Sequence, residues 1–179
     1  MDTPAPVGSN RPTRSPAFYI LIAMGVGCGA ALILFAALAA VMLPVFVQAR
    51  EKARTRTCLE NAKLQQLAMR IYAADWDETM PPAAGWMDKL TPYVRSETVF
   101  HCPSVGRAAS GAYGYAYNRS LEGAKTADIQ YPGETIALYD STNLSRSASD
   151  RLTSLPRPGR HQAGNVVSYM DGHTRCVAD

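Results

Sequence analysis

The sequence has no charged residue between Ala17 and Val47, although Lys, Arg, Asp and Glu make up 18% of the chain. An uncharged apolar run of about 20 residues is long enough, at about 1.5 Å per residue, to cross a bilayer as a helix. A secretory signal peptide has a shorter apolar region followed by small residues. Here bulky and then basic residues follow. The run therefore predicts a retained single-pass transmembrane helix over residues 17–47, with a kink at Pro44.

The four cysteines include no Cys-x-x-Cys spacing, which argues against a zinc-finger or thioredoxin-like domain. Cys28 lies inside the apolar run, where we expect it to act as a small hydrophobic residue. If the rest of the chain lies outside the cytoplasm, two of the other three can form a disulfide. We favour Cys58–Cys102, because the chain turns back along the first helix before it reaches Cys102. A Cys102–Cys176 bond and three free thiols are the alternatives.

The sequence also lacks the residue patterns of common enzymes. Ser104 and Ser168 do not lie in a nucleophile-elbow context. Asp75, Asp77 and Glu78 lie at the expected end of a helix, and we interpret them as solvated groups rather than as a glycosidase pair. No basic face with interleaved aromatic residues is present. We therefore expect neither an enzyme nor a nucleic-acid-binding protein.

The segments around the apolar run have contrasting compositions. Residues 1–16 are rich in Pro, Ser and Thr and predict a disordered tail. Residues 48–75 contain no Gly or Pro and are rich in helix formers, so we expect the helix to continue through them. This continuation has two apolar faces: one with Ala49, Ala53, Leu64, Leu67, Ala68 and Ile71, the other with Cys58, Ala62, Met69 and Ala73.

The remaining sequence predicts a short helix over residues 86–94 and then an antiparallel sheet over residues 112–177. Alternating tyrosines mark the first strand, and Asp171-Gly172 predicts a type I′ hairpin between the last two. The expected strands cover residues 112–118, 135–139, 165–170 and 173–177, with a polar loop at 141–159. The predicted fold class is α+β, and the long helix covers one face of the sheet.

The stretch from Leu43 to Pro82 resembles the start of type IV pilin-like and type II secretion pseudopilin-like proteins. Three further features are similar to one subgroup of that family: VFHCPS at 99–104, YGYAYN at 113–118, and an ending in His161, nine residues, then Asp171-Gly172. The resemblance implies a pilin-like fold. The first half of the long helix would then lie in the bilayer, and the second half would pack on the sheet.

The resemblance also implies a role. The protein would be a structural, membrane-anchored subunit or accessory component of a type II secretion or type IV pilus-like assembly. Its N-terminal helix would contact the lipid bilayer and other pilin-like subunits or secretion machinery. It would lie in the inner (cytoplasmic) membrane with its C-terminal domain periplasmic or extracellular.

The N-terminal segment departs from the family pattern. Members carry a leader ending in Gly and followed by Phe-Thr-Leu-Ile-Glu. In an ungapped alignment on Pro44, that Gly falls on Ile22 and the Glu on Gly27. We therefore expect a degenerate leader and a retained tail. This departure favours an alternative function, in which a non-assembling, membrane-anchored envelope domain uses a pilin-like scaffold to bind a ligand or partner.

Charge alone favours the opposite orientation. Arg50, Lys52, Arg54 and Arg56 follow the apolar run, and the positive-inside rule would keep the domain after them in the cytoplasm. The family places its domain outside despite similar basic residues. Our expectation follows the family.

The histidine motif invites a comparison with metal sites. Asp140, His161 and Asp171 form a candidate metal set, and some pseudopilins of this class bind calcium near the C-terminus. Calcium, however, takes six to eight oxygen ligands and does not use His. Asp171 is already accounted for by its turn. We therefore expect a structural His161 and no cofactor, with calcium at these three residues as the minor alternative.

Overall fold

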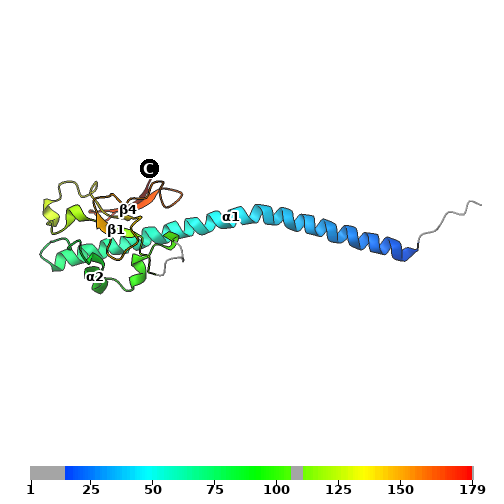
Figure 1. The fold of residues 1–179 in the computed structure, drawn as a ribbon, viewed down its shortest axis with the longest axis horizontal. Coiled ribbons are helices and arrows are strands. Elements are labelled where there is room, and N and C mark those ends of the chain that lie inside the picture. Colours follow the sequence, from blue (N-terminus) through cyan, green and yellow to red (C-terminus); the bar gives the residue numbers. More distant parts are fainter. Residues whose placement is uncertain (1–14, 106–110, 179) are drawn as a thin grey trace, which may run out of the picture. The chain divides into compact units, whose positions relative to one another are not determined.

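The computed structural model describes residues 15–105 and 111–178. Its fold class is α+β, as predicted. Helices α1 (Pro16–Asp75) and α2 (Trp86–Leu90) precede strands β1 (Tyr115–Asn118), β2 (Ile136–Asp140), β3 (Ser149–Asp150), β4 (Asn165–Tyr169) and β5 (Thr174–Val177) (Figure 1). Short 3-10 turns lie at Thr91–Tyr93, Glu97–Phe100, Pro103–Val105, Arg119–Leu121 and Thr126–Asp128. The tail expected at residues 1–16 falls, up to residue 14, outside the described residues.

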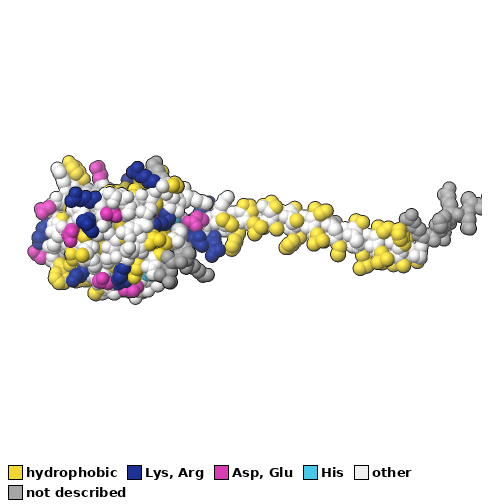
Figure 2. Space-filling view, in the orientation of Figure 1, with side chains coloured by type: hydrophobic (Ala, Val, Ile, Leu, Met, Phe, Trp, Pro, Cys, Tyr) yellow, Lys and Arg dark blue, Asp and Glu magenta, His cyan; other side chains and the backbone are white. Residues whose placement is uncertain are grey.

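The chain divides into two units, and the division falls between Val47 and Gln48 within α1. In the first unit, α1 is long and apolar enough to cross a membrane, and none of its most apolar 18-residue window is buried. Figure 2 shows hydrophobic side chains, and no charged ones, along this part of the helix. The helix continues through Pro44 without a break. The kink expected there stays a prediction.

In the second unit, residues 48–75 of α1 cover one face of the sheet. The face that packs is the one with small residues: Cys58, Ala62, Met69 and Ala73 are each at most 2% exposed. Small side chains allow the strands to come close to the helix. The Tyr115 hydroxyl, for example, donates a hydrogen bond to the carbonyl oxygen of Cys58 at 3.3 Å. On the other predicted apolar face, Leu64, Leu67 and Ile71 are 41–53% exposed, whereas Ala68 is 1% exposed and belongs to the main core.

The sheet has the strand order β3-β1-β2-β4-β5. All neighbouring pairs are antiparallel except β1 and β3, which are parallel. The main core lies between α1 and the sheet and is built around Met69, Trp86, Phe100, Tyr117 and Leu138. A second cluster, on the opposite face, contains Ala116, Tyr139, Ala148, Val167 and Tyr169. Both faces of β1 are therefore buried, which its alternating tyrosines alone did not predict.

Several boundaries differ from the sequence-based expectation. The short helix ends at Leu90 and continues as a 3-10 turn, since Pro92 has no N–H to continue the α-helical ladder. The first strand begins at Tyr115 rather than at residue 112, because Gly114 has φ +98°. The expected polar loop at 141–159 contains β3, which is only two residues long and adds a parallel pair to the sheet.

The hairpin between β4 and β5 corrects the type I′ prediction. A type I′ turn needs positive φ at both central residues, but only Gly172 has it here, at +101°. The Gly172 N–H donates a hydrogen bond to the Tyr169 carbonyl oxygen, and the Tyr169 N–H donates one to the His173 carbonyl oxygen. This is the pattern of a three-residue loop over Met170, Asp171 and Gly172, a type I turn followed by a glycine bulge. The Asp171 carboxylate accepts a hydrogen bond from the His173 N–H at 3.0 Å, which fixes the loop.

Candidate functional site

His161 is the centre of a buried polar cluster inside the second unit. It lies in the loop before β4, where its backbone and that of Gly164 exchange two hydrogen bonds of 2.9 Å each. This narrow turn requires Gly164, whose φ is +107°. The turn directs the imidazole inward, so that its side chain is fully buried.

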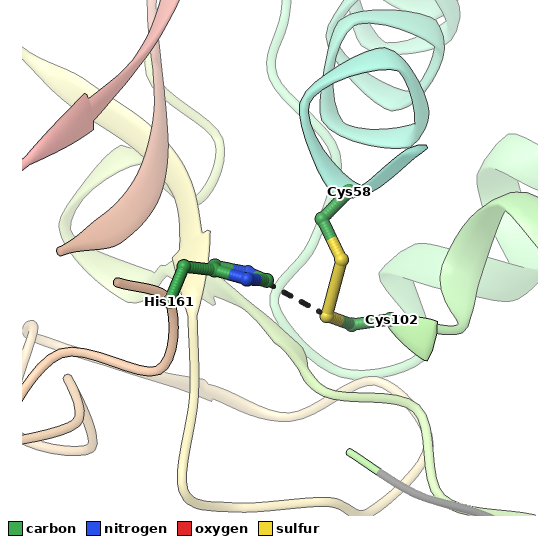
Figure 3. Close-up of side chains that lie close together, drawn as sticks. All are labelled: Cys58, Cys102 and His161. Carbon is green, nitrogen blue, oxygen red and sulfur yellow. Dashed lines mark hydrogen bonds between the residues drawn. A yellow bond between two sulfur atoms is a disulfide. The ribbon is translucent and has the colours of Figure 1, made fainter. Parts of the chain in front are cut away.

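A disulfide between Cys58 and Cys102 faces His161. Cys58 lies on α1, Cys102 lies just before the 3-10 turn at 103–105, and their Cα atoms are 5.4 Å apart. This is the pair that the sequence favoured. Figure 3 shows the edge of the His161 ring directed at the Cys102 sulfur atom, and Nε2 lies 3.8 Å from it.

The two ring nitrogens of His161 have different neighbours. Nδ1 lies 3.3 Å from the Thr55 hydroxyl and 3.7 Å from a Glu51 carboxylate oxygen, both on α1. Glu51 also accepts a hydrogen bond from the Ser104 hydroxyl at 2.9 Å. Nε2 lies 3.3 Å from the Asp140 carboxylate. His161 therefore connects α1, the Cys102 segment and the end of β2.

Asp140 is completely buried, and its charge is compensated by neighbouring groups. One carboxylate oxygen accepts a hydrogen bond from the Val166 N–H at 2.7 Å. The other lies 3.2 Å from the Arg160 guanidinium, whose side chain is 11% exposed. Arg160 also donates to the carbonyl oxygens of Gly114 and Ser141. Because an unpaired buried carboxylate would be costly, Arg160 is an essential partner of Asp140.

Cys176 is a third cysteine near this cluster. It pairs with Val166 in the β4–β5 register and packs against the same apolar group as the disulfide. Burial, together with the negative charge of Asp140, raises the pKa of the Cys176 thiol. A thiol with a raised pKa is a poor nucleophile at neutral pH. Cys176 is not part of the disulfide, so the alternative Cys102–Cys176 bond does not form.

The candidate calcium set is not assembled by the fold. Asp140 and His161 are adjacent, but Asp171 lies in the β4–β5 turn, at the opposite end of β4 from Val166. Its carboxylate oxygen is 2.6 Å from a ring nitrogen of His173. The backbone N–H of His173 lowers the pKa of Asp171. Antiparallel pairing of β2 with β4 separates the end of β2 from this turn, and the sequence spacing could not reveal that.

The carboxylates expected at the end of α1 also bind neighbouring residues. Asp77 lies 2.6 Å from the Lys125 ammonium, and the Thr126 hydroxyl donates to Glu78 at 2.7 Å. These contacts connect the end of the helix to the segment before β2. They are structural contacts, and the sequence-based interpretation of these groups as non-catalytic stays a prediction.

A separate groove of about 590 Å³ lies beside α1 in the second unit. Its lining includes Gln66, Arg70, Ile129, Met170 and Asp171. The Gln66 side chain is buried, and neither its amide nitrogen nor its amide oxygen has a hydrogen-bond partner among the described residues. The groove thus combines apolar side chains, the charged side chains of Arg70, Glu78 and Asp171, and an unsatisfied amide.

Sequence reasoning missed Arg160, Glu51 and Thr55 as members of the His161 cluster. The one available signal was the position of Arg160 directly before the motif histidine. Glu51 and Thr55 are four residues apart, so they lie on one face of α1, but nothing local indicated that this face meets His161.

Comparison with known proteins adds no further guide: no family model, curated protein or solved structure matches the chain.

Proposed function

We propose that the protein is a structural, membrane-anchored pilin-like subunit or accessory component of a type II secretion or type IV pilus-like assembly, and that it is not an enzyme. In this proposal, the apolar part of α1 anchors the chain in the inner membrane, and the second unit lies in the periplasm or outside the cell. The observation that carries the proposal is that one apolar face of α1 is left exposed beyond the anchor.

The exposed stripe consists of Leu64, Leu67 and Ile71 on α1. These positions follow the spacing of a single helical face. A row of large aliphatic side chains on the surface of a water-soluble region marks an interaction site more often than a solvated face. The same helix is apolar throughout its first unit, so a neighbouring helix of a similar subunit would meet apolar surface along both parts.

Site-specific photo-crosslinking in the native host tests this proposal. A benzoylphenylalanine at Leu67 should crosslink to the chain itself or to another pilin-like subunit, identified by mass spectrometry. The same group at Arg151, an exposed residue in the loop after β3, serves as the control and should give far less crosslinking. Equal crosslinking from both positions, or none from Leu67, would contradict the proposal.

The alternative function, a non-assembling anchored domain that binds a ligand or envelope partner, is supported by the groove that contains Gln66. A buried amide without a partner is costly, and a ligand group inside the groove could satisfy it. Benzoylphenylalanine at Ile129, which lines the groove, distinguishes the two functions. Leu67 and Ile71 also line the groove, so the comparison is made at Leu64, the residue of the stripe that lies outside it. Crosslinks from Ile129 to a protein that is not pilin-like, with none from Leu64, would favour the alternative.

A further inference from the structure

The disulfide and His161 form a compact group of potential metal ligands. The Cys58 sulfur, the Cys102 sulfur and one ring nitrogen of His161 all lie within 4.8 Å of one another, and all three residues are buried. In the oxidised protein the sulfur atoms are bonded to each other and have no thiolate to offer a metal. Reduction of the bond changes what this group can bind.

We propose that the reduced protein binds one zinc ion through Cys58, Cys102 and His161. A dithiol reductant transfers two electrons and two protons to the disulfide, yielding two thiols and leaving the reductant as its own disulfide. Zinc then displaces the two thiol protons and binds both thiolates and the neutral imidazole. The site is distinct from the calcium set considered from the sequence, and it does not depend on the proposed assembly function.

The observed spacing fits tetrahedral zinc. With Zn–S bonds of about 2.3 Å and Zn–N bonds of about 2.0 Å, a sulfur and a nitrogen ligand lie about 3.6 Å apart. Cys102 Sγ and His161 Nε2 are already 3.8 Å apart. The two sulfur ligands of such a site lie about 3.8 Å apart. The separation of the two sulfur atoms has to grow after the bond is cut, and the proposal requires the Cys58 side chain on α1 to change its rotamer.

The oxygen atoms near Nδ1 of His161 suit a histidine that binds zinc through Nε2. A zinc-bound histidine donates its other ring N–H to an oxygen acceptor, which fixes the ring and its tautomer. Thr55 and Glu51 provide such oxygens beside Nδ1, at 3.3 and 3.7 Å. When zinc binds Nε2, on the side that faces Cys102, the ring proton lies on Nδ1, where these oxygens can accept it.

Asp140 lies beside this group of ligands rather than within it. Its carboxylate oxygen is 3.3 Å from Nε2, but the same oxygen accepts a hydrogen bond from the Val166 N–H, and the ligand atoms that all lie within 4.8 Å of one another are those of Cys58, Cys102 and His161. Two thiolates and an imidazole are a donor set that suits zinc and not calcium, and a zinc site with three protein ligands has water in its fourth position. Arg160 beside Asp140 offsets part of the negative charge that the thiolates would add.

Cobalt(II) titration of the full-length protein in detergent tests the inference, because cobalt reports thiolate ligation and tetrahedral geometry in its absorption spectrum. A Cys28→Ala/Cys176→Ala background leaves only the proposed pair. After reduction by a phosphine under nitrogen, we expect thiolate charge-transfer and tetrahedral bands that saturate at one cobalt per chain and disappear when zinc is added. The oxidised form of the same preparation should show none.

Matched variants assign the ligands. Cys58→Ser removes one of the two thiolates and should reduce the charge-transfer intensity per bound cobalt by about half, whereas His161→Gln should weaken cobalt binding at least as much as loss of a second-shell partner, about 10- to 100-fold. Restoring Cys176 should leave the spectrum unchanged. The inference is overturned if the reduced background protein keeps its circular dichroism but shows no bands, or if Cys58→Ser keeps the bands at full intensity. Should that variant not fold, the oxidised and reduced forms of the background protein still decide, since zinc should raise the melting temperature of the reduced form only.

Discussion

Gly164 offers a sharp test of how the His161 turn is built. A Cβ atom on Gly164 would lie 2.0 Å from the carbonyl oxygen of Val177 and 2.5 Å from its carbon. Both are backbone atoms at the end of β5, so no side-chain rotation can relieve the contact. Gly164 also has φ +107°, a region that residues with a side chain rarely adopt. Gly164→Ala should therefore displace either β5 or the turn that holds His161.

The expected cost can be built from these terms. A strained positive φ costs about 1–3 kcal/mol. Loss of the two hydrogen bonds between Gly164 and His161 adds roughly 1 kcal/mol each. The sum is about 3–5 kcal/mol, which is a large fraction of a typical domain's stability of about 5–15 kcal/mol. The melting temperature should fall by roughly 10 °C or more.

Gly172→Ala is the matched control. Gly172 has a similar φ of +101°, but a Cβ there would first meet the guanidinium of Arg70, at 3.1 Å, which can move aside. Its cost should be limited to the strain of about 1–3 kcal/mol. Guanidinium unfolding of both full-length variants in detergent, followed by near-ultraviolet circular dichroism, measures the difference. An equal or smaller loss for Gly164→Ala would refute this account of the turn.

Two further predictions concern buried and partly buried carboxylates. Burial raises the pKa of Asp150, but hydrogen bonds from Ser154, Tyr139 and the Thr153 N–H outweigh it and lower the pKa to about 2. Because the folded pKa lies below the unfolded one, the stability that Asp150 contributes is present above about pH 4 and lost as the pH falls towards 2. Asp150→Asn should therefore flatten the pH dependence of the unfolding free energy between about pH 4 and pH 2. An unchanged pH dependence in this variant would contradict the prediction. Arg160→Met leaves Asp140 buried without its cation and should cost about 3–5 kcal/mol in denaturant unfolding, while the double variant Arg160→Met/Asp140→Asn should recover part of that loss.

Local signals predicted the elements of the fold well. Apolar length, helix-forming composition and alternating tyrosines are encoded over a few residues, and they placed α1, α2 and four of the strands. The Asp171-Gly172 pair identified the hairpin, but not its loop length, because a one-residue change in register alters the turn type without altering the dipeptide. β3 escaped prediction because two residues in a polar loop carry no period.

The features that sequence reasoning missed depend on contacts between distant segments. Composition indicated two apolar faces on residues 48–75, but which one meets the sheet is decided by the small residues opposite Tyr115 and Ser168. The Ser168 hydroxyl lies 3.4 Å from the carbonyl oxygen of Ala62, a distance that larger residues on that face would not permit. Likewise, the antiparallel register of β2 and β4 brings Asp140 to His161 and places Asp171 at the far end of β4.

The compartment in which the second unit lies determines whether Cys58 and Cys102 are reduced or oxidised. By the positive-inside rule, the basic residues after the apolar run favour a cytoplasmic domain, where thiols are kept reduced. There, the proposed zinc would join α1 to the Cys102 segment. Outside the cytoplasm, the disulfide joins the same two segments. Because both links connect the same positions beside His161, we expect the same packing of α1 on the sheet in either compartment. The oxidation state of this pair in cells, and not the fold, therefore reports on which side of the membrane the domain lies.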